Sequence, residues 1–225
     1  MAKIGFYGGA FNPPTKAHIE LAKKVINECK LDKIIFVPVN DLYKKEGLIE
    51  SEHRVNMLKL VCKEDDNLEV SDIELKSNVN YKAIDIFRII DKEYNKDEKF
   101  YIMGTDNLKK ICKWKESERL VEDFNYIILN REDDDAKKII EENKLLEKNK
   151  NKFNIIKNNN FKKCSSTNIR NQIKNKEIPV YIDENVYDYI LKNNIKFWSI
   201  LHKNNKYYKN ITKILQKRNI FSIVV

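Results

Sequence analysis

The sequence lacks any long uninterrupted apolar run, either of the length that crosses a membrane or of the kind found in a signal peptide. We therefore expect a protein without a membrane segment, located in the cytoplasm. Paired cysteines are also missing: Cys29, Cys62, Cys112 and Cys164 are scattered and show none of the spacings of zinc sites or redox motifs. We expect them to be reduced, small apolar residues, and we predict no metal site built from protein ligands.

Carboxylate side chains are absent after Asp188, although the chain as a whole carries 43 basic and 34 acidic residues. Eight basic side chains follow that point: Lys192, Lys196, Lys203, Lys206, Lys209, Lys213, Lys217 and Arg218. Because this C-terminal stretch accounts for most of the excess, the rest of the chain is nearly neutral. A nucleic-acid-binding face across the main body is therefore not supported by charge.

Short apolar segments alternate with amphipathic segments along the chain, which is the pattern of an α/β fold. We expect strands at residues 4–7, 33–39, 68–75, 100–103, 124–130 and 153–156. We expect helices at residues 18–29, 53–62, 83–94, 136–146 and 183–194, and one that begins near residue 166. The first strand, helix and second strand form a βαβ unit, so the sheet is parallel. The predicted fold is a Rossmann-like doubly wound parallel sheet with helices on both faces.

The stretch Gly8-Gly9-Ala10-Phe11-Asn12-Pro13-Pro14-Thr15-Lys16-Ala17-His18 joins the first predicted strand to the first helix. Glycines let backbone approach a ligand closely, the prolines suit a turn into a helix, and Thr15 can cap that helix. A strand, turn and helix in this order direct N–H groups and the positive helix end at an anion. The pattern alone leaves two readings open: a phosphate site, or a tight turn in which His18 is a packed or capping histidine.

This stretch resembles the opening motif of the HIGH-motif nucleotidyltransferases, Gly-Gly/Ser-x-Phe-Asp/Asn-Pro followed by His/Thr-x-Gly-His. Thr15 and His18 occupy the two phosphate-binding positions. The resemblance further implies nucleotide contacts from Gly8, Gly9, Ala10 and Phe11. Ala17 stands where the family usually has glycine, and its methyl group could crowd the bound nucleotide.

A second segment, Ser165-Ser166-Thr167-Asn168-Ile169-Arg170, places hydroxyl residues before a predicted helix and an arginine one turn inside it. By itself this predicts ordinary N-caps and an exposed arginine. It also resembles the Ser-Ser-Thr-x-Ile-Arg motif of the same superfamily. That resemblance implies that Ser166, Thr167 and Arg170 hold the β- and γ-phosphates of ATP, a role for which hydroxyls, helix N–H groups and a guanidinium are suited.

Over about residues 3–195 the chain resembles bacterial nicotinate-nucleotide adenylyltransferases. The stretches that carry this resemblance are Val70-Ser71-Asp72-Ile73-Glu74-Leu75, Tyr101-Ile102-Met103-Gly104-Thr105-Asp106-Asn107-Leu108, Trp114 and Asn185-Val186-Tyr187-Asp188-Tyr189-Ile190. It implies that Gly104 and Asp106 contact the adenosine and that Trp114 stacks on the pyridine ring, for which a planar aromatic is suited. Without the family, Trp114 would be interpreted as a surface or core aromatic.

The segments on the acceptor side depart from that family. Leu42-Tyr43-Lys44-Lys45 replaces Pro-Pro-His-Lys, with Lys45 at the family's lysine, where it would contact a phosphate. Asn80-Tyr81-Lys82-Ala83-Ile84-Asp85 replaces Ser-Tyr-Thr-x-Asp-Thr, so Tyr81 matches and Lys82 stands at a threonine used in recognising nicotinate mononucleotide. Arg54 matches the family's arginine in the following helix, although it could equally be an ordinary surface arginine.

The resemblance implies an enzyme of NAD biosynthesis. The phosphate of nicotinate mononucleotide would attack the α-phosphorus of ATP, giving nicotinate adenine dinucleotide and pyrophosphate. No general base or covalent intermediate is needed, so catalysis is positioning and charge stabilisation. The expected catalytic residues are Thr15, His18, Lys45 and Arg170, and Mg²⁺ would bridge the phosphates of ATP. Transfer to another phosphate acceptor, such as nicotinamide mononucleotide or phosphopantetheine, is the alternative.

We expect a nucleotidyltransferase domain at residues 1–195 and a basic extension at residues 196–225. A second hypothesis is a non-enzymatic protein that keeps the fold and binds RNA or a partner through this extension. There Phe197, Trp198, Tyr207 and Tyr208 alternate with lysines, a composition that suits stacking on nucleic-acid bases. The apolar residues 220–225 need burial, and an interface in a homo-oligomer would provide it.

Overall fold

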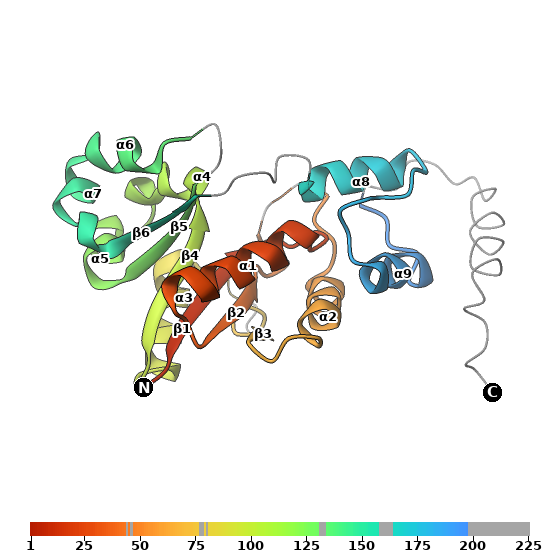
Figure 1. The fold of residues 1–225 in the computed structure, drawn as a ribbon, viewed down its shortest axis with the longest axis horizontal. Coiled ribbons are helices and arrows are strands. Elements are labelled where there is room, and N and C mark those ends of the chain that lie inside the picture. Colours follow the sequence, from red (N-terminus) through yellow and green to blue (C-terminus); the bar gives the residue numbers. More distant parts are fainter. Residues whose placement is uncertain are drawn as a thin grey trace.

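Among the described residues, six parallel strands form one sheet at the centre of the molecule (Figure 1). The computed structural model describes residues 1–43, 45, 47–76, 79, 81–130, 134–157 and 164–197. The strands are β1 (Lys3–Gly9), β2 (Lys33–Pro38), β3 (Leu68–Val70), β4 (Glu98–Gly104), β5 (Asn125–Asn130) and β6 (Phe153–Lys157). Their order across the sheet is β3-β2-β1-β4-β5-β6, so the direction of winding reverses between β1 and β4.

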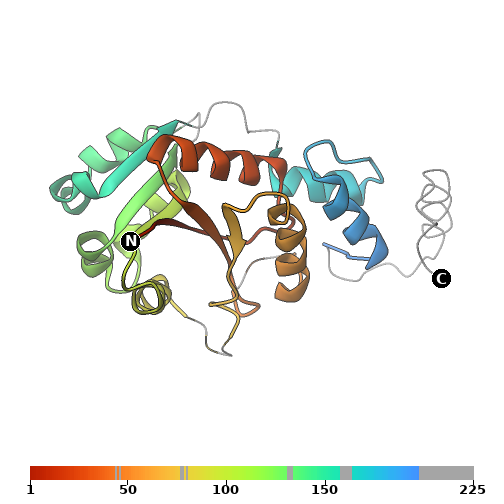
Figure 2. The same cartoon turned by 60° about the horizontal axis from the view of Figure 1, so that its bottom comes forward.

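Successive residues of each strand point to opposite sides of the sheet, so both of its faces are apolar. Helices cover both faces (Figures 1 and 2). Ile4 and Phe6 belong to one core cluster and Tyr7 to the other. One face is covered by α1 (Lys16–Cys29) and α2 (Ser51–Cys62). The other is covered by α3 (Ala83–Glu93), α4 (Thr105–Leu108), α5 (Ser117–Asp123), α6 (Ala136–Glu141) and α7 (Lys144–Lys148), with short 3₁₀ turns at Ile111–Lys113 and Lys150–Lys152. The predicted doubly wound fold is confirmed.

Two C-terminal helices, α8 (Ser166–Lys174) and α9 (Glu184–Lys192), lie beside α2 at one end of the sheet (Figures 1 and 2). They form a third core cluster, in which Met57 of α2 is buried between Ile169, Val186 and neighbouring apolar side chains. The tyrosine hydroxyl of Tyr189 is shared by His53 Nδ1 (3.0 Å) and Asn56 Nδ2 (3.1 Å), both on α2. Packing against α2 therefore fixes where α8 lies relative to the sheet.

Two predicted elements were wrong in length. The strand expected at residues 68–75 stops at Val70, because the hydroxyl of Ser71 accepts from Ile73 N–H (3.2 Å) and turns the chain out of the ladder. The helix expected at residues 136–146 is two helices, because the side-chain oxygen of Asn143 accepts from Leu145 N–H and Leu146 N–H and starts α7 as an N-cap.

The C-terminal predictions fall mainly outside the described residues, which end at 197. This applies to Trp198, Tyr207 and Tyr208 and to the apolar residues 220–225, so the extension and the homo-oligomer stay predictions. Phe197 is described and is 5% exposed, within the third core cluster. The helices among the described residues are all too short or too polar to cross a bilayer.

Candidate active site

The candidate site lies where β1 and β4 end side by side, at the reversal of strand order. The ladder between them runs from Lys3 opposite Glu98 to Tyr7 opposite Ile102, and the same register carried two residues further brings Gly9 beside Gly104. Ligands of open α/β sheets gather at such a point, outside the carboxyl ends of the strands. The structure thus brings together the ends of two strands that each finish in a glycine, Gly9 and Gly104.

His18 caps the first turn of α1 and is oriented by Thr15. Thr15 is the N-cap, and its N–H donates to His18 Nδ1 (3.0 Å), while its hydroxyl lies 2.8 Å from the same nitrogen. Because Nδ1 accepts a backbone N–H, the ring proton belongs on Nε2, which makes that nitrogen a donor. The reading of His18 as a capping histidine is therefore confirmed, and it is compatible with the phosphate role, which stays a prediction.

Phe11 packs the opening loop, residues 10–15, against the sheet. Its backbone has a positive φ of 47°, and its ring meets Phe36 edge-on at 5.3 Å and His18 at 5.2 Å between centroids. A methyl group on Gly9 would lie 2.9 Å from this ring, whereas one on Gly8 would meet nothing within 4 Å. Ala17, which replaces a family glycine, is only 6% exposed, so protein already covers most of its surface.

The Ser165-to-Arg170 segment contacts the opening loop directly, although the two are 153 to 158 residues apart. Ser166 Oγ donates to the Pro13 carbonyl oxygen (2.8 Å), and Arg170 Nη1 donates to the Asn12 carbonyl oxygen (2.9 Å). The alternative in which Arg170 is simply exposed is therefore wrong. Ser165 caps α8, as expected, by accepting from the N–H of Asn168 (3.1 Å).

A second cation, Lys45, lies near Arg170 and belongs to the loop between β2 and α2. Partial burial and, secondarily, the positive charge of Arg170 lower the pKa of Lys45. Burial also lowers the pKa of Arg170, and the second Nη of Arg170 donates to Thr167 Oγ1 (3.0 Å). Two neighbouring cations and the N-termini of α1 and α8 make this region suited to an anion with several charges.

The end of β4 lies beside a small polar network. Gly104 is the N-cap of α4, Asp106 is exposed in its first turn, and Thr105 is fully buried. The hydroxyl of Thr105 and the ammonium of Lys109 both donate to the carboxylate of Asp134. This network ties α4, which begins where β4 ends, to the residues just before α6, and the predicted adenosine contacts of Gly104 and Asp106 stay predictions.

Three predicted acceptor residues, Tyr81, Lys82 and Trp114, lie at or near the start of α3, whereas the fourth, Lys45, lies near Arg170. Lys82 is the N-cap and is exposed, and the carboxylate of Asp85 accepts from its N–H (3.0 Å). Lys115, next to Trp114, forms an ion pair with Asp85 (3.6 Å). Trp114 is partly buried against the core cluster that also holds Tyr81, so the two readings of this residue, packing and ligand contact, are compatible.

Two polar residues matter more than the sequence analysis indicated. The side chain of Asn12 is 1% exposed, and it donates to the Gly47 carbonyl oxygen (2.7 Å) and accepts from Ile49 N–H (3.4 Å). Arg54 is fully buried, so the surface reading of this arginine is wrong. The only signals for them were the asparagine of the opening motif and the family match of Arg54.

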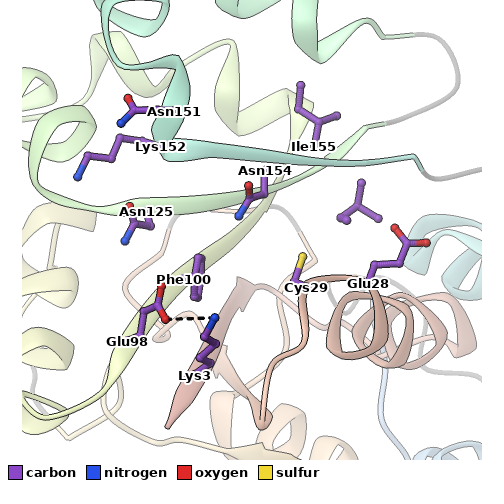
Figure 3. Close-up of a pocket in the computed structure, with 11 residues that line it drawn as sticks. Lys3, Glu28, Cys29, Glu98, Phe100, Asn125, Asn151, Lys152, Asn154 and Ile155 are labelled. Carbon is purple, nitrogen blue, oxygen red and sulfur yellow. Dashed lines mark ion pairs between the residues drawn. The ribbon is translucent and has the colours of Figure 1, made fainter. Parts of the chain in front are cut away.

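A shallow hollow elsewhere on the molecule does not contain these residues. It lies at the opposite end of the sheet, where β1, β4 and β5 begin, and Figure 3 shows the Lys3–Glu98 ion pair (3.5 Å) at its wall. In open α/β sheets this is not the end that binds ligands. Within the described residues, no three side chains of the kinds that bind metals lie together.

Comparison with known proteins identifies relatives over most of the chain. The sequence profile of the cytidylyltransferase-like family matches residues 6–172. A probable nicotinate-nucleotide adenylyltransferase of Fusobacterium nucleatum is 36% identical over 177 residues, which is 78% of this chain and 89% of that protein. Its counterpart in Clostridium tetani is 33% identical over 198 residues, covering 85% and 98%.

Solved structures share the same fold. The nicotinic acid mononucleotide adenylyltransferase of Plasmodium falciparum complexed with NaAD superposes with a TM-score of 0.70 at 23% identity, covering 87% of this chain and 97% of that chain. The same protein complexed with APC gives 0.72 at 22% identity with the same coverage. Since the bacterial relatives exceed 30% identity over nearly their whole length, the chain belongs to the nicotinate-nucleotide adenylyltransferase family.

Proposed function

We propose that this protein transfers the adenylyl group of ATP to nicotinate mononucleotide, forming nicotinate adenine dinucleotide and pyrophosphate. The observation that carries the proposal is the junction of the opening loop with the Ser166–Arg170 turn of α8 through the Asn12 and Pro13 carbonyl oxygens. This junction combines a helix N-terminus, an oriented histidine and two cations at the switch point of the sheet. It suits a nucleoside triphosphate better than a neutral ligand.

In the proposed reaction, a phosphate oxygen of the acceptor attacks the α-phosphorus of ATP as the bond to the β-phosphate bridging oxygen breaks. The attacking phosphate is already anionic, so the protein has no proton to remove. His18 donates from Nε2 to the phosphates at the reacting centre, and Thr15 holds the ring in that tautomer. Arg170 stabilises charge that moves onto the leaving pyrophosphate, and Lys45 holds the attacking phosphate of the acceptor at the reacting centre.

We propose that ATP enters as its Mg²⁺ complex. A Mg²⁺ ion bound mainly by phosphate oxygens and its own waters needs no cage of protein carboxylates. The chain then contributes cations and N–H donors to the same phosphates. The nucleotide contacts that the family resemblance implies complete this proposal on the ATP side. They are expected at Gly8, Gly9, Ala10, Phe11, Gly104 and Asp106.

On the acceptor side, Lys82 is the residue that favours nicotinate over nicotinamide. It stands at the start of α3, where the helix dipole and the ammonium both favour an anionic group. The pyridine-3-carboxylate of nicotinate mononucleotide is anionic and the amide of the nicotinamide compound is not. Trp114 and Tyr81 supply apolar surface for an aromatic ring in the same region.

The experiment that tests this function is an acceptor panel. The purified full-length protein is incubated with Mg²⁺, ATP and either nicotinate mononucleotide, nicotinamide mononucleotide or phosphopantetheine, and pyrophosphate release is measured. We expect the highest kcat/KM with nicotinate mononucleotide. A higher value with another acceptor would contradict the assignment of the substrate, and no release with any acceptor would contradict adenylyl transfer.

Two variants of His18 separate its proposed role in catalysis from its role in capping α1. His18→Asn keeps an acceptor for the Thr15 N–H but lacks the Nε2 donor, so we expect a stable fold and a kcat lower by about two orders of magnitude. His18→Gln places an amide donor nearer the Nε2 position and should retain more activity than His18→Asn. Pyrophosphate release near the wild-type rate in His18→Asn would refute the assigned role.

A further inference from the structure

Arg54 is among the largest of the fully buried side chains that the structure describes, yet it carries a charge. It lies in the first turn of α2, and burial is the main influence on its guanidinium, whose pKa is lowered. A buried guanidinium is retained in a fold only when hydrogen bonds and an opposite charge compensate for its lost hydration. The partners of Arg54 therefore indicate what the residue is for.

Those partners come from two loops. Arg54 Nη1 donates to the Ala10 carbonyl oxygen (3.2 Å), in the opening loop. Its Nη2 donates to Asp41 Oδ1 (3.1 Å), and its Nε donates to the Ile49 carbonyl oxygen (2.9 Å). Asp41 and Ile49 lie near the two ends of the loop between β2 and α2, which we call the Lys45 loop (residues 39–50). One side chain thus joins the opening loop to both ends of the Lys45 loop.

Asp41, near the start of the Lys45 loop, also bonds to the residue that follows the end of this loop. Its two carboxylate oxygens accept from Ser51 N–H (2.6 Å) and Ser51 Oγ (2.8 Å), at the first residue of α2. The helix's own N-cap residue, Glu50, makes no capping bond with its side chain. Asp41 therefore replaces the missing cap and holds the ends of the Lys45 loop together.

Glu74 is the second carboxylate near the Arg54 guanidinium, and it connects the turn after β3 to the same place. Its Oε1 accepts from Asn40 N–H (3.3 Å), and its charge and that of Asp41 favour the protonated Arg54. Asn40 in turn donates from Nδ2 to the Val79 carbonyl oxygen (3.0 Å), two residues before Tyr81. The network thus extends from the opening loop to the segment that leads into the acceptor side.

We propose that Arg54 is a positioning residue for adenylyl transfer, because its guanidinium fixes the position of the Lys45 loop relative to the opening loop. This inference rests on the proposed function. The opening loop carries the groups proposed to hold ATP, and Lys45 the group proposed to hold a phosphate at the reacting centre. Transfer between two bound substrates depends steeply on their relative placement, so a small shift between the loops lowers kcat while each substrate still binds.

The test is Arg54→Lys in the full-length protein, which keeps the charge but replaces a three-armed fork with a single ammonium. We expect kcat with saturating ATP and acceptor to fall at least tenfold, while the Kd for ATP alone, measured by titration calorimetry, changes less than threefold. Arg119→Lys, at an exposed arginine on α5, is the matched control and should leave both values unchanged. Ile140→Ala, in the core cluster on the face of the sheet opposite to that of Phe11, shows what loss of stability alone does to kcat.

Asp41→Asn provides a second variant, since Asp41 is half exposed and its replacement leaves two of the three arginine bonds in place. We expect the same pattern in weaker form, with kcat about three- to tenfold lower and the Kd for ATP little changed. A kcat within twofold of wild type in a folded Arg54→Lys and in Asp41→Asn would overturn the inference. So would an equal loss of kcat in Ile140→Ala. An inactive wild-type protein would instead refute the proposed function.

Discussion

Gly8 and Gly9 are adjacent at the end of β1, but of the two it is Gly9 that a neighbouring side chain of the described residues constrains. A methyl group on Gly9 would meet the buried ring of Phe11, so this position is constrained by the protein itself. A methyl group on Gly8 would enter open space, and the backbone of Gly8 has no positive φ that would demand glycine. Among the described residues nothing requires glycine at this position, and the reason that the proposed function supplies is a nucleotide approaching the end of β1.

Gly8→Ala should separate ligand binding from folding. We expect the free energy of unfolding to change by less than about 0.5 kcal/mol, because the added methyl group touches nothing. The KM for ATP should rise about tenfold or more if the nucleotide passes over this position. Steady-state kinetics and urea denaturation measure the two effects.

Gly9→Ala is the matched comparison for this prediction. Because its methyl group would lie 2.9 Å from the Phe11 ring, overpacking should lower the free energy of unfolding by about 1–3 kcal/mol. An unchanged KM for ATP in Gly8→Ala would show that the nucleotide does not approach this residue.

At the scale of the element, α2 connects the two halves of the candidate site. Its first turn holds Arg54, which joins the opening loop to the Lys45 loop, and its outer side packs against α9. The helix α8, with Ser166 and Arg170, belongs to the same C-terminal cluster. The turn that carries Ser166 and Arg170 is therefore positioned by helix packing as well as by its hydrogen bonds to the opening loop.

Tyr189→Phe should weaken this packing. It removes a hydroxyl shared by His53 and Asn56, so we expect a free energy of unfolding lower by about 1–2 kcal/mol and a KM for ATP a few-fold higher. Thermal unfolding and initial-rate kinetics check the two values. Tyr94→Phe, at the end of α3, is a control in which the KM for ATP should stay the same. If the KM for ATP does not change in Tyr189→Phe, α9 does not position α8 for binding.

At the scale of the whole molecule, Glu74 makes stability depend on pH near neutrality. Burial raises the pKa of its carboxyl group to about 7, against an ordinary value of 4.5. The folded protein therefore binds this proton more tightly than the unfolded chain, and the free energy of unfolding falls as pH rises from 4.5 through 7. A shift of this size corresponds to about 3 kcal/mol.

Glu74→Gln removes that ionisation, so its stability relative to wild type should increase by up to about 3 kcal/mol between pH 5 and pH 8. Urea denaturation of both proteins at the two pH values measures the difference, and subtracting wild type cancels the other carboxylates. Glu64→Gln, at an exposed position, should show no such change. An equal difference at both pH values would contradict the raised pKa.

Much of the fold was predictable because apolar periodicity is local. The buried faces of α1, α2 and α3 and the βαβ start of the sheet follow from residue spacing alone. The end of β3 and the break between α6 and α7 were missed, because each depends on one side chain, of Ser71 or Asn143, that accepts backbone N–H groups.

The candidate site was predictable as a set of segments but not as an arrangement. Motif resemblance selected the segments of Thr15, His18 and Arg170, and the structure brings these together. Sequence could not show that Arg170 donates to the Asn12 carbonyl oxygen, because a backbone acceptor has no residue-type signal. For the same reason the burial of Arg54 was left open, since its acceptors at Ala10 and Ile49 are also carbonyl oxygens.

Contacts between α1 and the C-terminal part of the described chain bear on the order in which the protein assembles. The first N–H of α1 donates to the Tyr181 carbonyl oxygen (3.0 Å), so the helix that carries His18 is completed by residues near the end of the described chain. Contacts of such long sequence separation form late, because closing a long loop costs entropy before any contact compensates for it. During synthesis, the sheet can therefore form while the candidate site is still incomplete, and a chain released early would fold in part without acquiring activity.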